Sequence, residues 1–193
     1  MRIFLAGASG VIGVRLVPLF VEAGHDVAAM TRSPEKVDAL AGLGATPVVC
    51  DAFDALGVRR AVIDFGADAI VNELTDLPDD PAELAGGTAL NARIRREGGG
   101  NLLAAAHALG GIRTIAQSVA WELAGDGGAA VVELERATLA AGGVVLRYGR
   151  FYGPGTYWEA ELPPTPRVHI DEAARQTVPA LDAVSGVILI AEE

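Results

Sequence analysis

The sequence predicts an α/β fold in which a doubly wound parallel sheet carries helices on both faces. The chain opens with a short apolar run, a glycine-containing turn and an apolar segment of helical length, all within residues 2–23. Strand-like and helix-like segments then alternate at intervals of about 20 residues, which requires crossover connections and therefore parallel strands. A length of 193 residues suits one domain, residues 1–193.

The opening turn has the composition of a phosphate-binding strand–turn–helix. Its glycines recur at intervals of three, and Val11–Ala23 is the expected helix. Glycines allow positive φ and a close approach of the backbone to a pyrophosphate, while the helix N-terminus attracts the anion. The expected cofactor-binding residues here are Gly7, Ala8, Ser9, Gly10, Val11, Ile12 and Gly13. The alternative is a glycine-rich turn that binds nothing.

The end of the second expected strand, Val27–Met30, indicates which dinucleotide is bound. An NAD site usually has an acidic residue here, roughly 20 residues beyond the glycines, to bind the ribose 2′-hydroxyl. This chain has Thr31 and Arg32 instead, with Lys36 one helical turn further on. Arg32 could pair with a 2′-phosphate, so the sequence favours NADP over NAD. The alternative is an arginine that merely solvates a loop.

The middle of the chain continues the alternation. Ser33 is expected to cap a short helix, and a third strand ends in an aspartate that could cap the helix after it. A glycine run is expected to bend the long helix or to let it approach the cofactor. In order, the expected elements are a helix at Pro34–Leu43, a strand at Pro47–Asp51, a helix at Val58–Phe65, a strand at Asp68–Asn72, a polar loop at Asp79–Pro81 and a helix at Leu84–Leu109 interrupted at Gly98–Gly100.

The last third adds further strands and a helix that Asp171 is expected to cap. In order, the expected elements are a strand at Thr114–Ser118, a loop at Ala124–Ala130, a helix at Val131–Ala141, a strand at Gly143–Arg147, a short run at Arg167–Ile170 and a closing strand at Gly186–Ala191.

Charge and cysteine content limit the function classes. A net charge of −10 argues against nucleic-acid binding, and the basic cluster Arg93–Arg96 is best interpreted as a solvated helix face. Cys50, the single cysteine, excludes an internal disulfide and is expected to be a small core residue. No run approaches the roughly 18 apolar residues of a membrane span, and cleavage of a leader would destroy the glycine turn. A cytoplasmic protein that does not bind membranes is expected, and no metal site is predicted.

Several motifs occur together in one order: GASGVIG at 7–13, NELTDLP at 72–78, GNLLAAA at 100–106, AQS at 116–118, LRYGRFYGPG at 146–155 and VHIDEAA at 168–174. With these motifs the chain resembles the extended and atypical short-chain dehydrogenase/reductases, the family that includes NAD-dependent epimerases and dehydratases. The resemblance implies a Rossmann-like fold, an NAD(P) site at the carboxyl ends of the strands, a small-molecule substrate and, because members commonly dimerise through helices, a homodimer.

The resemblance also implies roles for individual residues. Asp51 and the backbone of Ala52 would contact the adenine, and Leu74 would complete the cofactor site. Ser118 matches the active-site serine or threonine, with an ordinary strand-end serine as the equal alternative. The loop 148–152 would lie beside the nicotinamide, which makes Tyr148 and Tyr152 further catalytic candidates.

Two departures from the family bear on catalysis. The usual acid/base is a tyrosine followed four residues later by a lysine, which share one helix face so that the ammonium lowers the phenol pKa. Gly127 and Val131 occupy those positions and transfer no proton. Residues 151–193 also form only a reduced substrate-binding portion, in which Trp121, Tyr157 and Trp158 either line a small pocket or belong to the core.

Three functions therefore stay open. The first is an oxidoreductase or epimerase-like enzyme that transfers hydride to a small hydroxyl- or carbonyl-bearing substrate. The second is a non-catalytic NAD(P)(H)-binding sensor or partner protein, which the missing tyrosine and lysine favour. The third is an isomerase or cyclase without net redox change. Fold alone does not decide among them.

Overall fold

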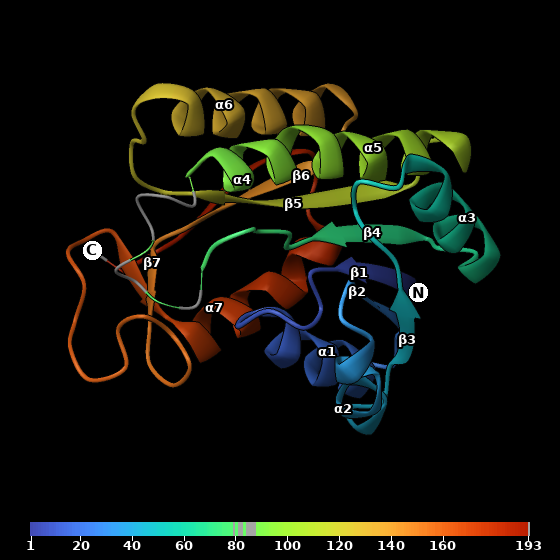
Figure 1. Cartoon of the computed structure of the whole chain (residues 1–193), viewed down its shortest axis with the longest axis horizontal. Helices are drawn as coiled ribbons and strands as arrows, with labels where there is room; N and C mark the ends of the chain where they lie inside the picture. The colour runs from blue at the N-terminus through green and yellow to red at the C-terminus, as the bar shows by residue number, and fades with distance from the viewer. Residues whose placement is uncertain (79, 81–82, 84–87, 193) are drawn as a thin grey trace.

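The computed structural model describes residues 1–78, 80, 83 and 88–192, and it confirms the predicted α/β fold (Figure 1). Seven strands form one fully parallel sheet in the order β3-β2-β1-β4-β5-β6-β9. The strands are β1 (Arg2–Ala6), β2 (Asp26–Thr31), β3 (Thr46–Val49), β4 (Ala69–Asn72), β5 (Arg113–Val119), β6 (Val144–Tyr148) and β9 (Gly186–Ile190). The strand order reverses between β1 and β4, and ligands of open parallel sheets bind at such a switch point.

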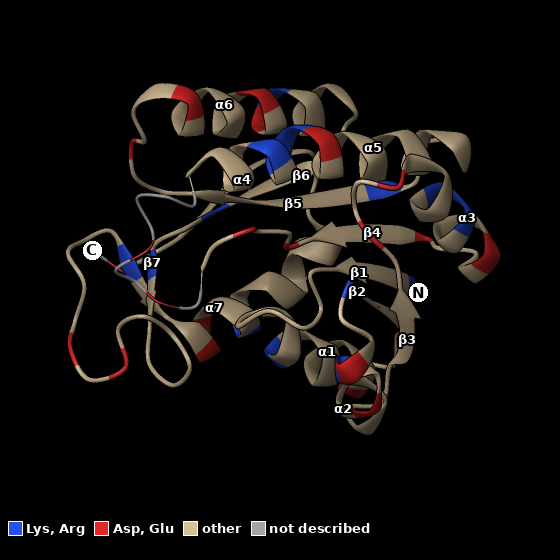
Figure 2. Ribbon diagram, in the orientation of Figure 1, with Lys and Arg blue, Asp and Glu red and all other residues tan. Residues whose placement is uncertain are grey.

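Helices cover both faces of this sheet (Figure 1). One face carries α1 (Gly13–Glu22), α2 (Val37–Gly42) and α7 (Ile170–Thr177), and the other carries α3 (Ala55–Phe65), α4 (Thr88–Arg93), α5 (Gly99–Ala108) and α6 (Gly125–Ala140). Side chains alternate along β1, so Ile3 and Leu5 pack in the first core and Phe4 packs in the second. Charged residues lie mainly on helices and loops (Figure 2).

The region after β2 differs from the prediction in its caps. A 3₁₀ turn, η1 (Pro34–Lys36), precedes α2, and the Ser33 side chain makes no capping bond. Instead the Ser33 N–H donates to Thr31 Oγ1 at 3.2 Å. Asp51 is not a helix cap either, because its carboxylate accepts from Phe53 N–H at 2.9 Å, while Asp54 caps α3 by accepting from Gly57 N–H at 3.0 Å.

The long helix is interrupted, as expected, but mostly before the glycine run and by a π turn rather than a break. Residues Ile94–Gly98 form this turn, η3, between α4 and α5. A Cβ on Gly99 would lie 2.7 Å from Leu134 Cδ1, so the glycine lets α5 pack closely on α6. The predicted loop at 79–81 and helix start at 84 lie outside the described residues.

Helix α6 begins at Gly125, so the loop predicted over Ala124–Ala130 is wrong. Arg96 stabilises this first turn from the neighbouring helix, with ion pairs to Asp126 at 2.7 Å and Glu133 at 2.6 Å. Helix α7 also begins differently, because His169 is its N-cap and accepts from Asp171 N–H through Nδ1. Tertiary ion pairs and a histidine cap are not visible in local helix propensity.

The C-terminal segment packs on the same core as the glycine turn. Strands β7 (Arg150–Tyr152) and β8 (Arg167–His169) form a small parallel sheet, and the 3₁₀ turn η4 (Val178–Asp182) leads to the edge strand β9. Val168, Ile170 and Ala174 are buried in one cluster with Leu16 of α1. Within the described ranges, no helix has both the length and the apolar character needed to cross a bilayer.

Candidate cofactor and active site

The glycine turn has no room for side chains at two of its glycines. Gly7 has φ +83°, and a Cβ there would lie 2.6 Å from the carbonyl oxygen of Glu73. A Cβ on Gly13 would collide with the Gly7 carbonyl oxygen. Gly10 is exposed, and only the Gly7 oxygen, at 3.3 Å, lies near its Cβ position. The turn is therefore packed against β4 on one side and open at Gly10.

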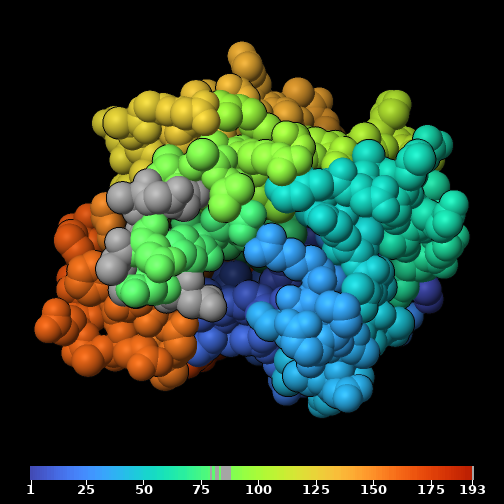
Figure 3. Space-filling model, viewed as in Figure 1, coloured from blue at the N-terminus to red at the C-terminus, as the bar shows by residue number. Residues whose placement is uncertain are grey.

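The N-terminus of α1 fits an anion. Its N-cap residue, Ile12, makes no side-chain capping bond, and the first turn of the helix contains no acidic residue. The positive end of the helix dipole thus has no side-chain anion of the helix itself to offset it. Figure 3 shows a hollow beside this turn, between the light-blue segment that follows β2 and the green segment that follows β4. A pyrophosphate would fit both the helix end and the glycine cradle.

Two predicted adenosine-binding residues line one open groove. Arg32 and Asp51 border it together with Cys50 and Arg60. The Arg32 guanidinium is 63% exposed and pairs with Asp76 at 3.0 Å, across from β2 to the segment after β4. Cys50 is half-buried rather than a core residue, and burial raises the pKa of its thiol.

The remaining predicted cofactor residues lie close to the turn. Ser9 Oγ and Thr31 Oγ1 are 3.0 Å apart, which joins the turn to the end of β2. Leu74 N would be 3.1 Å from a Cβ on Gly7, which places Leu74 against the turn. The Ala52 carbonyl is occupied, because Asn101 Nδ2 donates to it at 2.8 Å.

The three predicted catalytic residues do not converge. Ser118 is 2% exposed and donates to Glu135 Oε1 at 2.6 Å, so it faces α6 rather than the open crevice. Arg147 binds both oxygens of the same carboxylate, at 2.8 and 2.6 Å, and these hydrogen bonds lower the pKa of Glu135. Ser118 pairs in register with Arg147, so Tyr148, the next residue of β6, points to the opposite face. This alternation separates Ser118 from Tyr148.

Tyr148 belongs to a buried polar chain that the sequence did not reveal. Its hydroxyl lies 3.1 Å from Glu73 Oε1 and 2.6 Å from Thr177 Oγ1. Burial raises the pKa of Glu73 to about 8, and burial also raises the pKa of Tyr148. Since the backbone of Glu73 borders Gly7, this chain ends beside the glycine turn. Sequence offered one signal, an acidic residue directly after a buried strand.

Tyr152 lies apart from the other two predicted catalytic residues, Ser118 and Tyr148. Its hydroxyl donates to Glu192 at 2.7 Å, and its ring packs edge-on against His169 with centroids 5.2 Å apart. The Arg150 guanidinium lies over the Trp121 ring, 4.6 Å from its centroid. Tyr157 is exposed. Trp121, Tyr157 and Trp158 are therefore not core residues.

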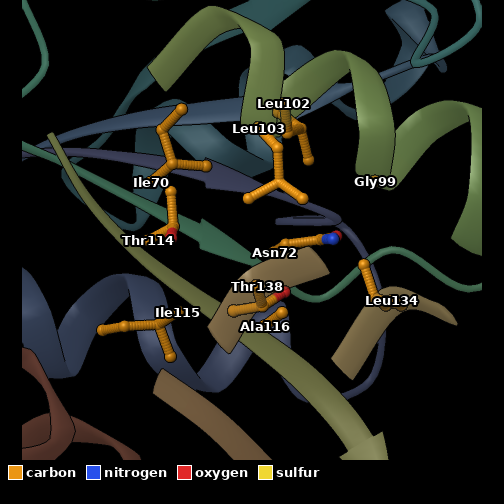
Figure 4. Close-up of a pocket in the computed structure, with 10 residues that line it drawn as sticks. All are labelled: Ile70, Asn72, Gly99, Leu102, Leu103, Thr114, Ile115, Ala116, Leu134 and Thr138. Atoms are coloured by element: carbon orange, nitrogen blue, oxygen red, sulfur yellow. The ribbon is translucent and has the colours of Figure 1, made fainter. Parts of the chain in front are cut away.

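Figure 4 shows a second cavity, which is enclosed between β4 and β5 on one side and α5 and α6 on the other. Apolar side chains such as Leu102 and Leu134 line most of it. The hydroxyls of Thr114 and Thr138 are buried there without hydrogen-bond partners. It lies beneath the helices and is lined mostly by apolar side chains, so it does not suit a charged dinucleotide.

Comparison with known proteins supports the nucleotide site. A family model described as NAD(P)H-binding matches residues 7–133. A 3-diazoavenalumate denitrifying reductase from Streptomyces is 37% identical over 183 residues, which cover 81% of this chain and 58% of that protein. An uncharacterized protein of Schizosaccharomyces pombe is 45% identical over 49 residues, which cover 25% of this chain and 17% of that protein. The chain thus spans less than two thirds of the length of either relative.

Solved structures share the fold. UDP-glucose 4-epimerase of Thermus thermophilus, crystallised with NAD, superposes with a TM-score of 0.81 at 18% identity, covering 99% of this chain and 78% of that one. A short-chain dehydrogenase/reductase of Burkholderia thailandensis superposes with a TM-score of 0.79 at 18% identity, covering 98% and 90%. The predicted resemblance is confirmed: this chain has the Rossmann-like fold of the epimerases and short-chain reductases, and it belongs to the NAD(P)H-binding family.

Proposed function

We propose that this protein is an NAD(P)H-dependent reductase of a small organic substrate. The observation that carries the proposal is the glycine cradle, in which Gly7 and Gly13 admit no side chain and α1 presents an uncapped N-terminus. When bound, the dinucleotide supplies a hydride at the carboxyl ends of the strands. The 37% identity to a reductase over most of this chain favours reduction over epimerisation.

The chain's own residues would hold the cofactor in a definite order. The amides of residues 11–13 would bind the pyrophosphate, since the Gly10 amide donates to the Gly7 carbonyl, and Asp51 would lie at the adenine. Arg32 would bind a 2′-phosphate, for which it has to leave Asp76. We propose a preference for NADPH on this basis.

The class of reaction that we propose follows from the lack of a proton donor on α6. Gly127 and Val131 stand where the family has its tyrosine and lysine, so α6 delivers no proton to a developing alkoxide. The name of the Streptomyces relative describes the reduction of a diazo compound with loss of nitrogen. When hydride attacks a diazonium carbon, the C–N bond breaks and its electron pair leaves with N2, so no alkoxide forms and no proton is needed. We propose a substrate of this kind, or a carbonyl compound that is protonated by water.

The competing functions have distinct expectations. A sensor or partner protein would bind cofactor tightly without turnover. An isomerase or cyclase would turn over a substrate without any change in the absorbance of the nicotinamide. A reductase would oxidise NADPH in proportion to the product formed.

Calorimetric titration with NADPH and NADH tests the nucleotide site first. We expect the wild type to prefer NADPH, Gly10→Val to bind neither cofactor, and Arg32→Ala to lose about tenfold or more in NADPH affinity without losing NADH affinity. Asp76→Asn should strengthen NADPH binding, because it releases Arg32. Arg59→Ala, an exposed arginine on α3, is the matched control.

Two results would overturn the reductase proposal. If the wild type binds neither dinucleotide, the glycine turn serves only the fold, and the reductase assignment fails with it. If NADPH binds and a screen of diazo and carbonyl compounds consumes none of it, the sensor function replaces the reductase.

A further inference from the structure

Arg95 is a buried cation for which the described part of the chain provides no anion. Its side chain is 4% exposed, its Nε has no hydrogen-bond partner, and burial lowers the pKa of its guanidinium. Its neighbours behave differently: Arg93 pairs with Glu97 at 3.0 Å, and Arg96 pairs with Asp126 and Glu133. The predicted solvated helix face is therefore correct for Arg93 and Arg96 and wrong for Arg95.

The surroundings of Arg95 locate it near the switch point of the sheet. Asn91, one turn earlier on the same helix, accepts from Asp76 N–H at 3.1 Å. Gly99, one turn later, faces Leu134 and Asn72 Nδ2, the latter 3.5 Å from its Cβ position. Arg95 thus lies on the helix face directed at the end of β4 and at α6.

The facing part of α6 is where the catalytic pair of the family is missing. Helix α6 packs on both α4 and η3. Gly127 provides no side chain, and its Cβ position lies 3.3 Å from Thr88 Cγ2 of α4. Val131 is buried and neutral. Arg96 on this interface is already paired with two carboxylates of α6, so the cation left unpaired among the described residues here is Arg95, on a π turn of the kind often found at functional sites.

We propose that Arg95 binds an anionic group of the substrate, a carboxylate, where η3 packs on α6. An isolated buried charge is costly, so a guanidinium kept there without a protein partner implies an anion that arrives with a ligand. Its planar fork suits a carboxylate, which it can bind with two hydrogen bonds. The identification of the ligand as substrate rests on the proposed reductase function.

The cofactor is the other possible source of an anion. Its pyrophosphate would lie at the glycine turn and α1, on the face of the sheet opposite to α4 and α6. A substrate carboxylate is therefore the better match, and the experiment separates the two sources by measuring NADPH affinity independently.

The test compares Arg95→Met and Arg95→Lys with the wild type, with Arg59→Met as the control at an exposed position. The melting temperature of each protein is measured without additive, with sodium benzoate, with benzamide as the neutral isostere of benzoate, and with sodium chloride at equal ionic strength. We expect Arg95→Met to keep or raise the melting temperature. Benzoate at ten times its Kd for the wild type should raise the melting temperature of the wild type by about 3 °C, whereas benzamide should not raise it. Arg95→Met should lose this shift, Arg95→Lys should retain part of it, and NADPH affinity should not change.

Three results would overturn the proposal. One is a wild type that benzoate stabilises no more than chloride does. A second is a marked loss of stability in Arg95→Met, which would mean that the guanidinium has a protein partner. A third is an NADPH affinity lowered about tenfold in Arg95→Met, which would assign the anion to the cofactor. Failure of the wild type to bind NADPH would instead refute the reductase function, and the benzoate comparison would still decide whether Arg95 is an anion site.

Discussion

The proton on Glu73 is determined by hydrogen-bond geometry. Thr177 donates its hydroxyl proton to the Ala173 carbonyl at 2.8 Å, so its oxygen can only accept from Tyr148 at 2.6 Å. The Tyr148 hydroxyl then has its one proton directed at Thr177. The Tyr148 oxygen can therefore only accept a hydrogen bond from Glu73, 3.1 Å away, and a carboxyl group that donates must be neutral. The raised pKa of Glu73, about 8, agrees with this assignment.

A pH-dependent stability follows for Glu73. Its folded-state pKa is about 8 against a usual value of 4.5, so the folded state retains a proton that the unfolded chain releases. Its contribution is therefore fully present below the unfolded pKa and is lost as pH rises to the folded pKa, at up to about 1.4 kcal/mol per pH unit. Glu73→Gln, which is neutral at every pH, should gain in unfolding free energy relative to the wild type between pH 5 and 8.

Urea denaturation at several pH values between 5 and 8 measures this difference. Glu22→Gln, at an exposed position on α1, is the control and should follow the wild type. Parallel curves for Glu73→Gln and the wild type would show that Glu73 is already ionised in the folded protein.

At the scale of elements, Arg15 joins three segments that lie far apart in the chain. Its guanidinium pairs with Asp171 of α7 at 2.6 Å and donates to the carbonyls of Val11 in the glycine turn and Pro154 after β7. Arg15 therefore couples the glycine turn to the C-terminal segment.

A double-mutant cycle of Arg15→Ala and Asp171→Ala tests this coupling. We expect a coupling free energy of about 1 kcal/mol in urea denaturation, because the arginine is mostly buried while the aspartate is half-exposed. The Arg15 guanidinium lowers the pKa of Asp171, so the coupling should be present at neutral pH and be lost as pH falls through that lowered pKa.

The matched control is the surface pair Arg175–Glu172 on α7, for which a smaller coupling free energy is expected because solvent screens its exposed charges. Equal coupling in the two pairs would mean that Arg15 forms an ordinary surface ion pair. A normal NADPH affinity in Arg15→Ala would show that the turn does not depend on it.

At the scale of the whole molecule, one core connects the nucleotide-binding and C-terminal parts. Leu5 and Leu16 from the first part are buried in the same cluster as Val168, Ile170 and Leu181 from the second. A shared core of this kind predicts a single domain, as the sequence did, with residues 151–193 completing it.

Cooperative unfolding is the expected consequence. Far-ultraviolet circular dichroism and the fluorescence of Trp121 and Trp158, both partly exposed, should give coincident urea transitions. A Trp121→Phe variant would isolate Trp158, which reports on the C-terminal part. An earlier transition for that tryptophan alone would mean that residues 151–193 unfold as a separate unit.

The sequence by itself determined the sheet and the nucleotide end of the molecule. Strand periodicity and the glycines act over a few residues, so β1, α1 and the parallel sheet could be predicted from them, whereas the placement of Leu74 at the turn came from the family resemblance. Caps were less predictable, because the Ser33 side chain makes no capping bond at η1, and His169 rather than Asp171 caps α7.

Tertiary structure alone decided which polar side chains meet. Ser118 and Tyr148 lie on neighbouring strands, but the register pairs Ser118 with Arg147 and so sends the two side chains to opposite faces. Glu73 became a buried acid, and Arg95 a buried cation, through contacts between segments tens of residues apart. Burial and charge pairing depend on such long-range neighbours, whereas strand and turn patterns depend on near ones. The sequence therefore predicted the glycine turn and the sheet that carries it, and the fold decided which polar residues surround them.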